Sequence, residues 1–379
     1  MKISRVNIVT DKEIFFGNVT IENGKFSNIQ KLSSKPSTRA KFLLPGFIDS
    51  HTHGGYGWDF NQLAKNNFKN IDKYLEGVVS EGVTTIVGTT VTCSKKDLNS
   101  ISKNWKKFID KDQNKIVAGW YIEGPFISQE KKGAHDQKLV TPIDLKVLNQ
   151  IKKQNNFVKI LAVAPEVKNN LNLISKISKD YIVSIGHSNC SADIALHAMI
   201  NGAKRIIHLY NQTSKFDHRN PGIINMAFLD IPIYCELICD GFHVNKLVLK
   251  NTYDIVKPDR IIIITDSLSC KGLPNGSYKL GTLNTYKTSE IVRLKSDDTI
   301  AGSIKPFNKQ VQTFLEATHC NMIELAKMSS LNAAKSIGLD DKIGIIKKGY
   351  LADFVIVDSK INIYKTYKNG KLVYENRGI

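Results

Sequence analysis

Short apolar runs rich in valine, isoleucine and threonine recur eight times through the middle of the 379-residue chain. Most neighbouring runs are far enough apart for a helix, and the segments at 70–79 and 191–200 carry apolar residues at helical spacing. Eight alternating strand and helix units over roughly 250 residues are typical of a TIM (β/α)8 barrel. The runs cover residues 46–51, 83–91, 116–123, 158–164, 181–187, 204–209, 233–240 and 260–266.

The two ends of the chain have a different pattern. Residues 1–44 alternate polar and apolar positions as short strands do, and residues 345–379 repeat this style with a hairpin signal at Asn369-Gly370. We therefore expect an α/β fold: a (β/α)8 barrel at 45–344 beside a small β-sandwich domain built from both termini, 1–44 and 345–379. Residues 271–295 should form a loop or small hairpin beside the site, and residues 308–338 two helices.

Composition excludes several classes of protein. The formal charge of +18 comes from lysines spread along the whole chain, without the basic, aromatic-interleaved clusters of nucleic-acid-binding proteins. No apolar segment is long enough for a signal peptide or a membrane span. The six cysteines form no CxxC pair and lie mostly in apolar runs, as reduced core thiols do. We expect a cytoplasmic protein that binds neither nucleic acid nor membrane, with a positive field that favours an anionic small substrate.

A candidate metal site begins at the end of the first run, in the sequence Pro45 to Gly54. His51 and His53 lie two residues apart, so on a strand both imidazoles point to the same side. Active sites of barrels gather at the carboxyl ends of the strands, so the remaining ligands should follow later runs. Four polar residues stand at such ends: Glu123, His187, His208 and Asp266.

These residue types suit hydrolysis by a metal-activated water. Glu123, His187 and His208 make a set of two histidines and one carboxylate, which leaves coordination positions open for water. Asp266 is then free to take the proton from that water and pass it to a leaving amine. Each residue singly also has an ordinary structural explanation: a turn cap for Glu123, hydrogen-bonded core histidines, or a helix N-cap for Asp266. Their joint position at strand ends favours the site.

The sequence motifs around these candidate residues resemble those of a known family. The Pro45 to Gly54 signature, with later histidines and an aspartate at strand ends, is similar to the amidohydrolase superfamily. Within it, the chain resembles the N-acetylglucosamine-6-phosphate deacetylases. The motifs that carry this resemblance are Ile122-Glu123-Gly124-Pro125-Phe126, Lys132-Gly133-Ala134-His135, Gly186-His187-Ser188-Asn189, His208-Leu209-Tyr210-Asn211, Arg219-Asn220-Pro221-Gly222, Asp240-Gly241-Phe242-His243-Val244 and Thr265-Asp266.

The resemblance implies hydrolysis of the acetamide of N-acetylglucosamine 6-phosphate to glucosamine 6-phosphate and acetate. It implies a divalent metal, zinc or iron, held by Glu123, His187 and His208, with Asp266 as catalytic base and acid. Whether the site holds one ion or two per subunit remains open, because this chain keeps both His51 and His53. The other implied substrate-binding residues are His135, His243, Asn211, Gln212 and Arg219, the last reaching across the interface of a homodimer.

Competing interpretations are weaker. A dihydroorotase-like cyclic amidase usually needs a carboxylated lysine at a strand end, but the only lysine of the fourth run, Lys159, is near its start. A deaminase would normally show His-Ala-Glu where this chain has His187-Ser188-Asn189. A non-catalytic sugar-phosphate-binding protein would be expected to lose Asp266 or a ligand. Another amidohydrolase, acting on a different N-acyl sugar phosphate or cyclic amide, is the nearest alternative.

Overall fold

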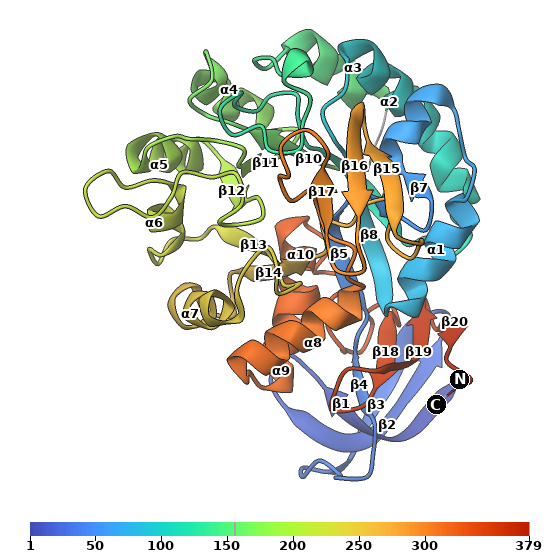
Figure 1. The fold of residues 1–379 in the computed structure, drawn as a ribbon. Helices are drawn as coiled ribbons and strands as arrows, with labels where there is room; N and C mark the ends of the chain where they lie inside the picture. Colours follow the sequence, from blue (N-terminus) through green and yellow to red (C-terminus); the bar gives the residue numbers. More distant parts are fainter. Residues whose placement is uncertain (155–156, 379) are drawn as a thin grey trace.

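A parallel eight-stranded barrel forms the centre of the computed structural model, which describes residues 1–154 and 157–378 (Figure 1). Its strand order is β14-β13-β12-β11-β10-β9-β8-β5, and every strand overlaps one of the eight expected runs. The barrel prediction is therefore confirmed. The strands are β5 (Phe47–Thr52), β8 (Val83–Thr90), β9 (Val117–Ile122), β10 (Val158–Val163), β11 (Ile182–Ile185), β12 (Ala203–Ile206), β13 (Tyr234–Ile238) and β14 (Ile261–Ile264).

Helices cover the outside of the barrel because each has one apolar face. In α2 (Lys95–Lys111), Leu98, Ile101, Trp105 and Phe108 are fully buried at three- to four-residue spacing. The strands β5, β8 and β14 are buried at every position, as parallel strands covered on both sides are. The other helices are α1 (Ile71–Ser80), α3 (Leu145–Gln154), α4 (Asn170–Ile177), α5 (Ala192–Ile200), α6 (Ile223–Ala227), α7 (Lys246–Val256) and α8 (Phe307–Thr318).

Side chains close the barrel between β5 and β14, the two ends of the strand order. The Asp49 carboxylate accepts hydrogen bonds from the backbone N–H of Thr265 (3.1 Å) and from its hydroxyl (2.5 Å). Next to it, the N–H of Asp266 donates to the carbonyl of His51 at 2.9 Å. Burial raises the pKa of Asp49 to about 6, against the lowering effect of its hydrogen bonds with Thr265. This seam fixes the strand end of His51 beside that of Asp266.

The chain termini form a separate seven-stranded sheet, seen below the barrel with the two termini close together (Figure 1). Its order is β20-β19-β18-β4-β1-β2-β3. Asn369 and Gly370 both have positive φ and connect the last two strands, which confirms the hairpin expected there. The boundaries 1–44, 45–344 and 345–379 stay a prediction. The strands are β1 (Lys2–Val9), β2 (Ile14–Glu22), β3 (Lys25–Ser33), β4 (Phe42–Pro45), β18 (Phe354–Val357), β19 (Ile363–Lys368) and β20 (Lys371–Glu375).

A small insertion stands at the mouth of the barrel. The polar segment after β14 forms a three-stranded antiparallel sheet, where a loop or hairpin was expected. Its Leu280, Val292 and Leu294 pack with Val91 and Leu268 from the barrel end, so the sheet covers one side of the pocket described below. The strands are β15 (Gly276–Leu280), β16 (Leu283–Lys287) and β17 (Val292–Leu294).

The remaining elements connect these parts. After α8 the chain forms α9 (Met322–Ala326), a π-helical turn (Lys327–Leu331) and α10 (Asn332–Ser336) in direct succession, so the second helix expected within 308–338 is these three elements together. Between β5 and α1 lie the short strands β6 (Gly54–Gly55) and β7 (Trp58–Asp59) and the 3-10 turn Phe60–Lys65, and a further 3-10 turn covers Gln137–Leu139. Within the described ranges, the helices lack the combination of length and apolarity that spanning a bilayer requires.

Candidate active site

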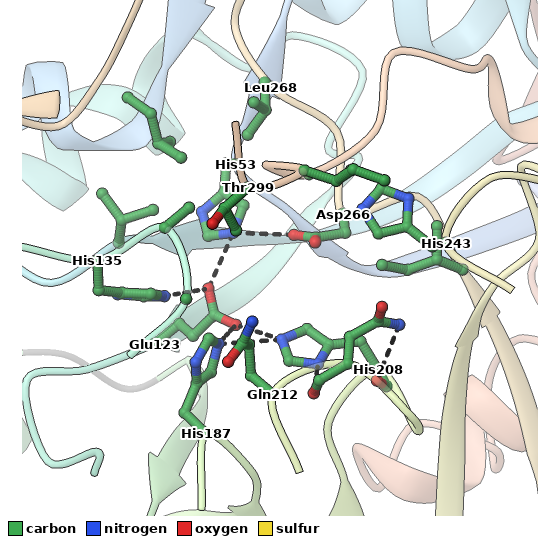
Figure 2. Close-up of a pocket in the computed structure, with 18 of the residues that line it drawn as sticks. His53, Glu123, His135, His187, His208, Gln212, His243, Asp266, Leu268 and Thr299 are labelled. Atoms are coloured by element: carbon green, nitrogen blue, oxygen red, sulfur yellow. Dashed lines mark hydrogen bonds and ion pairs between the residues drawn. The ribbon is translucent and has the colours of Figure 1, made fainter. Parts of the chain in front are cut away.

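Glu123, directly after β9, lies at the centre of a cluster of histidines (Figure 2). The side chain is 1% exposed, and five imidazole Nε2 atoms lie within 3.6 Å of its carboxylate oxygens. Burial alone would raise the pKa of Glu123, but the surrounding histidines hold it well below its ordinary value, so the group is a carboxylate. The five distances are 2.9 Å to His53, 3.1 Å to His208, 3.2 Å to His187, 3.4 Å to His51 and 3.6 Å to His135.

The three residues expected to hold a metal are brought together. Oε1 of Glu123 lies 3.2 Å from Nε2 of His187 and 3.1 Å from Nε2 of His208, and the two nitrogens lie 3.1 Å apart. Tetrahedral zinc with ligands at 2.0–2.1 Å would place its donors about 3.3 Å apart. The Nδ1 atoms of both rings bond to backbone carbonyls, at 2.8 Å for Lys131 and 3.1 Å for Asn211, which leaves both Nε2 lone pairs facing the centre. This donor set fits a divalent ion.

Three site residues leave their strands through left-handed backbone. His187 (φ 45°), His208 (φ 22°) and Asp266 (φ 50°) lie two residues after the ends of β11, β12 and β14. Residues other than glycine seldom adopt positive φ, and such residues concentrate at functional sites because the surrounding structure must hold them. The backbone here turns the three side chains toward the barrel axis, where Glu123 lies.

His51 and His53 form a second set with Asp266. Oδ1 of Asp266 lies 3.0 Å from Nε2 of His53 and 3.4 Å from that of His51. Burial lowers the pKa of each histidine, but Glu123 outweighs it: the pKa of His53 rises to about 9 and that of His51 rises well above its ordinary value. The pKa of Asp266 is lowered, burial being outweighed by its hydrogen bond to His53 and the nearby histidine charges. Positive charge is thus favoured here, and a bound cation would replace these protons.

His135 enters the same space in a different protonation state. The backbone N–H of Thr92 donates to its Nδ1 at 3.2 Å, and the Thr92 hydroxyl lies 2.7 Å from the same nitrogen. Burial, together with repulsion from His187, holds the pKa of His135 well below its ordinary value. A neutral ring that accepts at Nδ1 carries its proton on Nε2, which faces Glu123. This tautomer would make His135 a hydrogen-bond donor in the pocket, although its position beside Glu123 and His187 would also suit a metal ligand.

In Figure 2, His243 lies beside Asp266, on the side away from Glu123. Its Nδ1 lies 2.7 Å from Oδ2 of Asp240, and both side chains are almost fully buried. Burial lowers the pKa of His243, but the hydrogen bond to Asp240 and its charge raise it overall. The pKa of Asp240 falls to about 2, its hydrogen bond to His243 outweighing burial. The pair therefore favours the protonated form of the ring that lines the pocket.

A cavity of about 270 Å³ opens above these groups. Nine sequence candidates line it, including Asn211 and Gln212, whereas His51 lies beneath its floor in contact with Glu123. Arg219 is not there. It is exposed on the loop before α6 and lines a separate cleft with Asn189 and Ser191. The other seven candidates in the cavity lining are His53, Glu123, His135, His187, His208, His243 and Asp266.

Sequence reasoning missed the supporting residues. Glu236 and Arg205 are fully buried in the barrel interior, and Thr92 and Asp240 orient His135 and His243. A charged residue inside an apolar strand run, as Glu236 is, could have been noticed, because such residues must be paired when buried. Lys159, by contrast, lies at the start of β10, away from the carboxyl ends of the strands, as the argument against a carboxylated lysine requires.

Comparison with known proteins agrees with the family resemblance of the sequence motifs. Residues 260–373 match the model of the Amidohydrolase family. The chain is 31% identical to the N-acetylglucosamine-6-phosphate deacetylase of Bacillus subtilis over 98% of this chain and 96% of that protein. It is 34% identical to the enzyme of that name from Lysinibacillus sphaericus, over 88% and 85%. The crystal structure of N-acetylglucosamine-6-phosphate deacetylase from Thermotoga maritima superposes with a TM-score of 0.92 at 34% identity, covering 99% of this chain and 100% of that one.

Proposed function

Since this chain belongs to the N-acetylglucosamine-6-phosphate deacetylase family of amidohydrolases, we propose that its central pocket hydrolyses N-acetylglucosamine 6-phosphate to glucosamine 6-phosphate and acetate. The observation that carries this proposal is the arrangement around Glu123. A buried carboxylate shared by converging imidazoles, with Asp266 beside it, supplies both a divalent-metal site and a proton carrier. Amide hydrolysis at neutral pH needs both.

Glu123, His187 and His208 would hold the metal. When bound, a divalent ion supplies Lewis acidity, polarising the acetamide carbonyl and lowering the pKa of a water molecule toward neutrality. Asp266 takes the proton of the attacking water as the new C–O bond forms. It then gives this proton to the sugar nitrogen as the C–N bond breaks, so that acetate and a free amine leave.

We infer that two donor sets, which share Glu123, would hold two divalent ions per subunit, zinc or iron. Oε1 of Glu123 faces His187 and His208, whereas Oε2 faces His53 at 2.9 Å. The second set of donors, His51, His53 and Asp266, lies together with Glu123 in one cluster of ligand atoms. Imidazole and carboxylate ligands suit both zinc and iron.

Neutral and charged donors surround the place of the substrate. His135 offers an Nε2–H to the carbonyl oxygen, where negative charge develops during attack. His243, whose protonated form Asp240 favours, faces the pocket from the opposite side and would bind sugar or acetyl oxygens. Asn211 and Gln212 line the cavity rim and would contribute to the phosphate end through amide and backbone groups.

A phosphate would need a cation that this chain does not place in its own cavity. Among the described residues that line it, none is lysine or arginine. Arg219 stands exposed on a loop held by Asp217, whose carboxylate accepts the Arg219 N–H at 2.7 Å, near the exposed Phe216 (57%) and Leu229 (51%). We infer a homodimer in which this apolar surface is covered and Arg219 of a second copy binds the phosphate. Guanidinium suits that contact because it binds phosphate bidentately.

Product analysis tests the reaction directly. The purified enzyme, incubated with N-acetylglucosamine 6-phosphate, should yield glucosamine 6-phosphate by mass spectrometry, and N-acetylgalactosamine 6-phosphate in parallel measures epimer selectivity. Metal analysis of the same sample should give two ions per chain, with His53→Asn reducing the number to one. If the substrate is unchanged while another N-acyl sugar phosphate or a cyclic amide is hydrolysed, the substrate assignment is wrong.

A further inference from the structure

One of the histidines around Glu123 is held by a carboxylate from inside the barrel. Nδ1 of His51 lies 2.8 Å from Oε2 of Glu236 in β13, and both side chains are 0% exposed. Nε2 of the same ring faces Glu123 and Asp266, at 3.4 Å each. The two nitrogens of His51 therefore have separate partners: one in the barrel interior and one in the metal site.

The other histidines of the site are held differently. His187 and His208 direct Nδ1 to backbone carbonyls, which are neutral acceptors. The Nδ1 atom of His53 is buried and has no hydrogen-bond partner within the described part of the chain. His51 is thus the ligand candidate with a carboxylate partner, an arrangement that fixes the tautomer of a ligating histidine and raises its basicity.

Glu236 is itself fixed by a buried arginine. Oε1 accepts from Nε of Arg205 at 3.1 Å and from Nη2 at 2.6 Å. The guanidinium also donates to the hydroxyls of Ser336 (2.7 Å) and Ser50 (2.8 Å), and Ser50 is the residue before His51. Because the Arg205 guanidinium holds Oε1 and is itself held by the two serine hydroxyls, the Glu236 carboxylate is fixed in one orientation. Oε2 is left to His51 and, at 3.4 Å, to the N–H of His208.

We propose that Glu236, held by Arg205, is a positioning residue for metal binding: it accepts the Nδ1–H of His51 and thereby keeps the Nε2 lone pair available to the ion shared by His51 and His53. The inference rests on the two-ion site proposed above. Glu236 touches neither substrate nor metal in this account. Its effect passes through the tautomer and orientation of the His51 ring, because the contact with His208 is to the backbone N–H and the His208 ring is held by the Asn211 carbonyl.

Glu236→Gln tests this chemistry because it preserves shape. The amide oxygen of the glutamine would face the charged Arg205, so its NH2 group would face Nδ1 of His51. That arrangement favours the tautomer with the proton on Nε2, which cannot bind metal. The variant should bind the ion at His51 and His53 about 10–100-fold more weakly, with the affinity of the ion at His187 and His208 unchanged. Zinc titration of chelated protein against a chromophoric chelator measures both affinities.

Two further variants separate positioning from folding. Glu81→Gln is the matched control, because Glu81 is also buried in an ion pair, 2.7 Å from Lys271, yet contacts Tyr56 and Phe307 instead of a histidine of the site. It should retain both zinc affinities even if its melting temperature falls. Should Glu236→Gln not fold, the double variant Arg205→Met/Glu236→Met removes both charges at similar volume, a replacement that buried ion pairs often tolerate. It should show the same weakened second affinity.

The outcomes are distinguishable. In a His51→Asn background, Glu236→Gln should cause no further loss of zinc affinity, because the ring through which it acts is absent. The positioning role would be overturned if both zinc affinities were unchanged in Glu236→Gln. Additive losses of zinc affinity in His51→Asn/Glu236→Gln would overturn it as well. If His51→Asn itself retains two zinc ions with unchanged affinities, the proposed two-ion site fails instead. Histidine-labelled, zinc-loaded protein should also show a protonated Nδ1 and a metal-bound Nε2 on His51 by nitrogen NMR.

Discussion

Nε2 of His187 and Nε2 of His208 lie 3.1 Å apart and both face Oε1 of Glu123. Two imidazoles whose Nδ1 atoms are engaged elsewhere direct their lone pairs at the same point, a contact that a shared cation stabilises. His208→Gln should therefore lose the ion at this position and lower deacetylase activity by at least about 100-fold. Metal content per chain and acetate release check this together. His197→Gln, on the exposed face of α5, is the control and should match the unaltered enzyme.

Replacement of Asp266 separates proton transfer from metal binding at Glu123, His187 and His208. Asp266→Asn keeps the size of the side chain but removes its capacity to accept a proton, so turnover should fall by about 10²–10⁴-fold. The ion at Glu123, His187 and His208 should remain, since those side chains are unaltered. Metal analysis beside steady-state kinetics measures both. Normal turnover in this variant would remove Asp266 from the mechanism.

Arg219 should act on the phosphate alone, and from a second subunit. Arg219→Ala is expected to raise KM for N-acetylglucosamine 6-phosphate by about 10–100-fold, the value of a charged hydrogen bond, while affecting N-acetylglucosamine little. Arg39→Ala, exposed in the terminal domain, is the control. Mixing Arg219→Ala with Asp266→Asn protein under subunit exchange should restore activity, because one site of the mixed dimer combines both native residues. No restoration would place Arg219 within its own subunit's site or outside the reaction.

The Asp240 and His243 pair predicts a pH dependence. His243 has a raised pKa, so its stabilising contribution is complete below the ordinary value of 6.5 and is lost as pH rises through the raised one. Asp240 contributes above its ordinary 3.8, and this contribution is lost as pH falls through about 2. In Asp240→Asn, His243 should titrate at lower pH, and the alkaline limb of substrate binding should move with it. Histidine Cε1–H NMR resonances followed against pH measure the shift. An unchanged titration of His243 would show that Asp240 does not control it.

The barrel and its ligand-bearing strand ends could be predicted because each strand is a distinct β-branched run and barrel sites gather at one end of the strands. His51, Glu123, His187, His208 and Asp266 each follow such a run, and the structure brings them together. Their partners could not be predicted in the same way. Glu236 is separated from His51 by 185 residues, and their contact depends on how strands pack across the barrel, which no local pattern encodes.

Arg219 illustrates a different limit. Its sequence motif pointed to phosphate, yet the structure places it on an exposed loop outside the cavity of its own chain. The resemblance implied a contact across a homodimer interface, but the periodicity of one chain cannot show where a second subunit would lie. The tautomer of His135 is a similar case, since it is set by the N–H of Thr92, which comes from a loop 43 residues away.

Acetate release from N-acetylglucosamine 6-phosphate, measured beside release from N-acetylglucosamine, tests the central claim most directly. The enzyme would be stripped by a chelator, assayed, and assayed again after reloading with zinc or with iron. We expect no release from the stripped enzyme, recovery with one of the metals, and a strong preference for the phosphorylated sugar. Undiminished release from fully stripped enzyme, or no release under either metal, would contradict a metal-dependent deacetylase centred on Glu123.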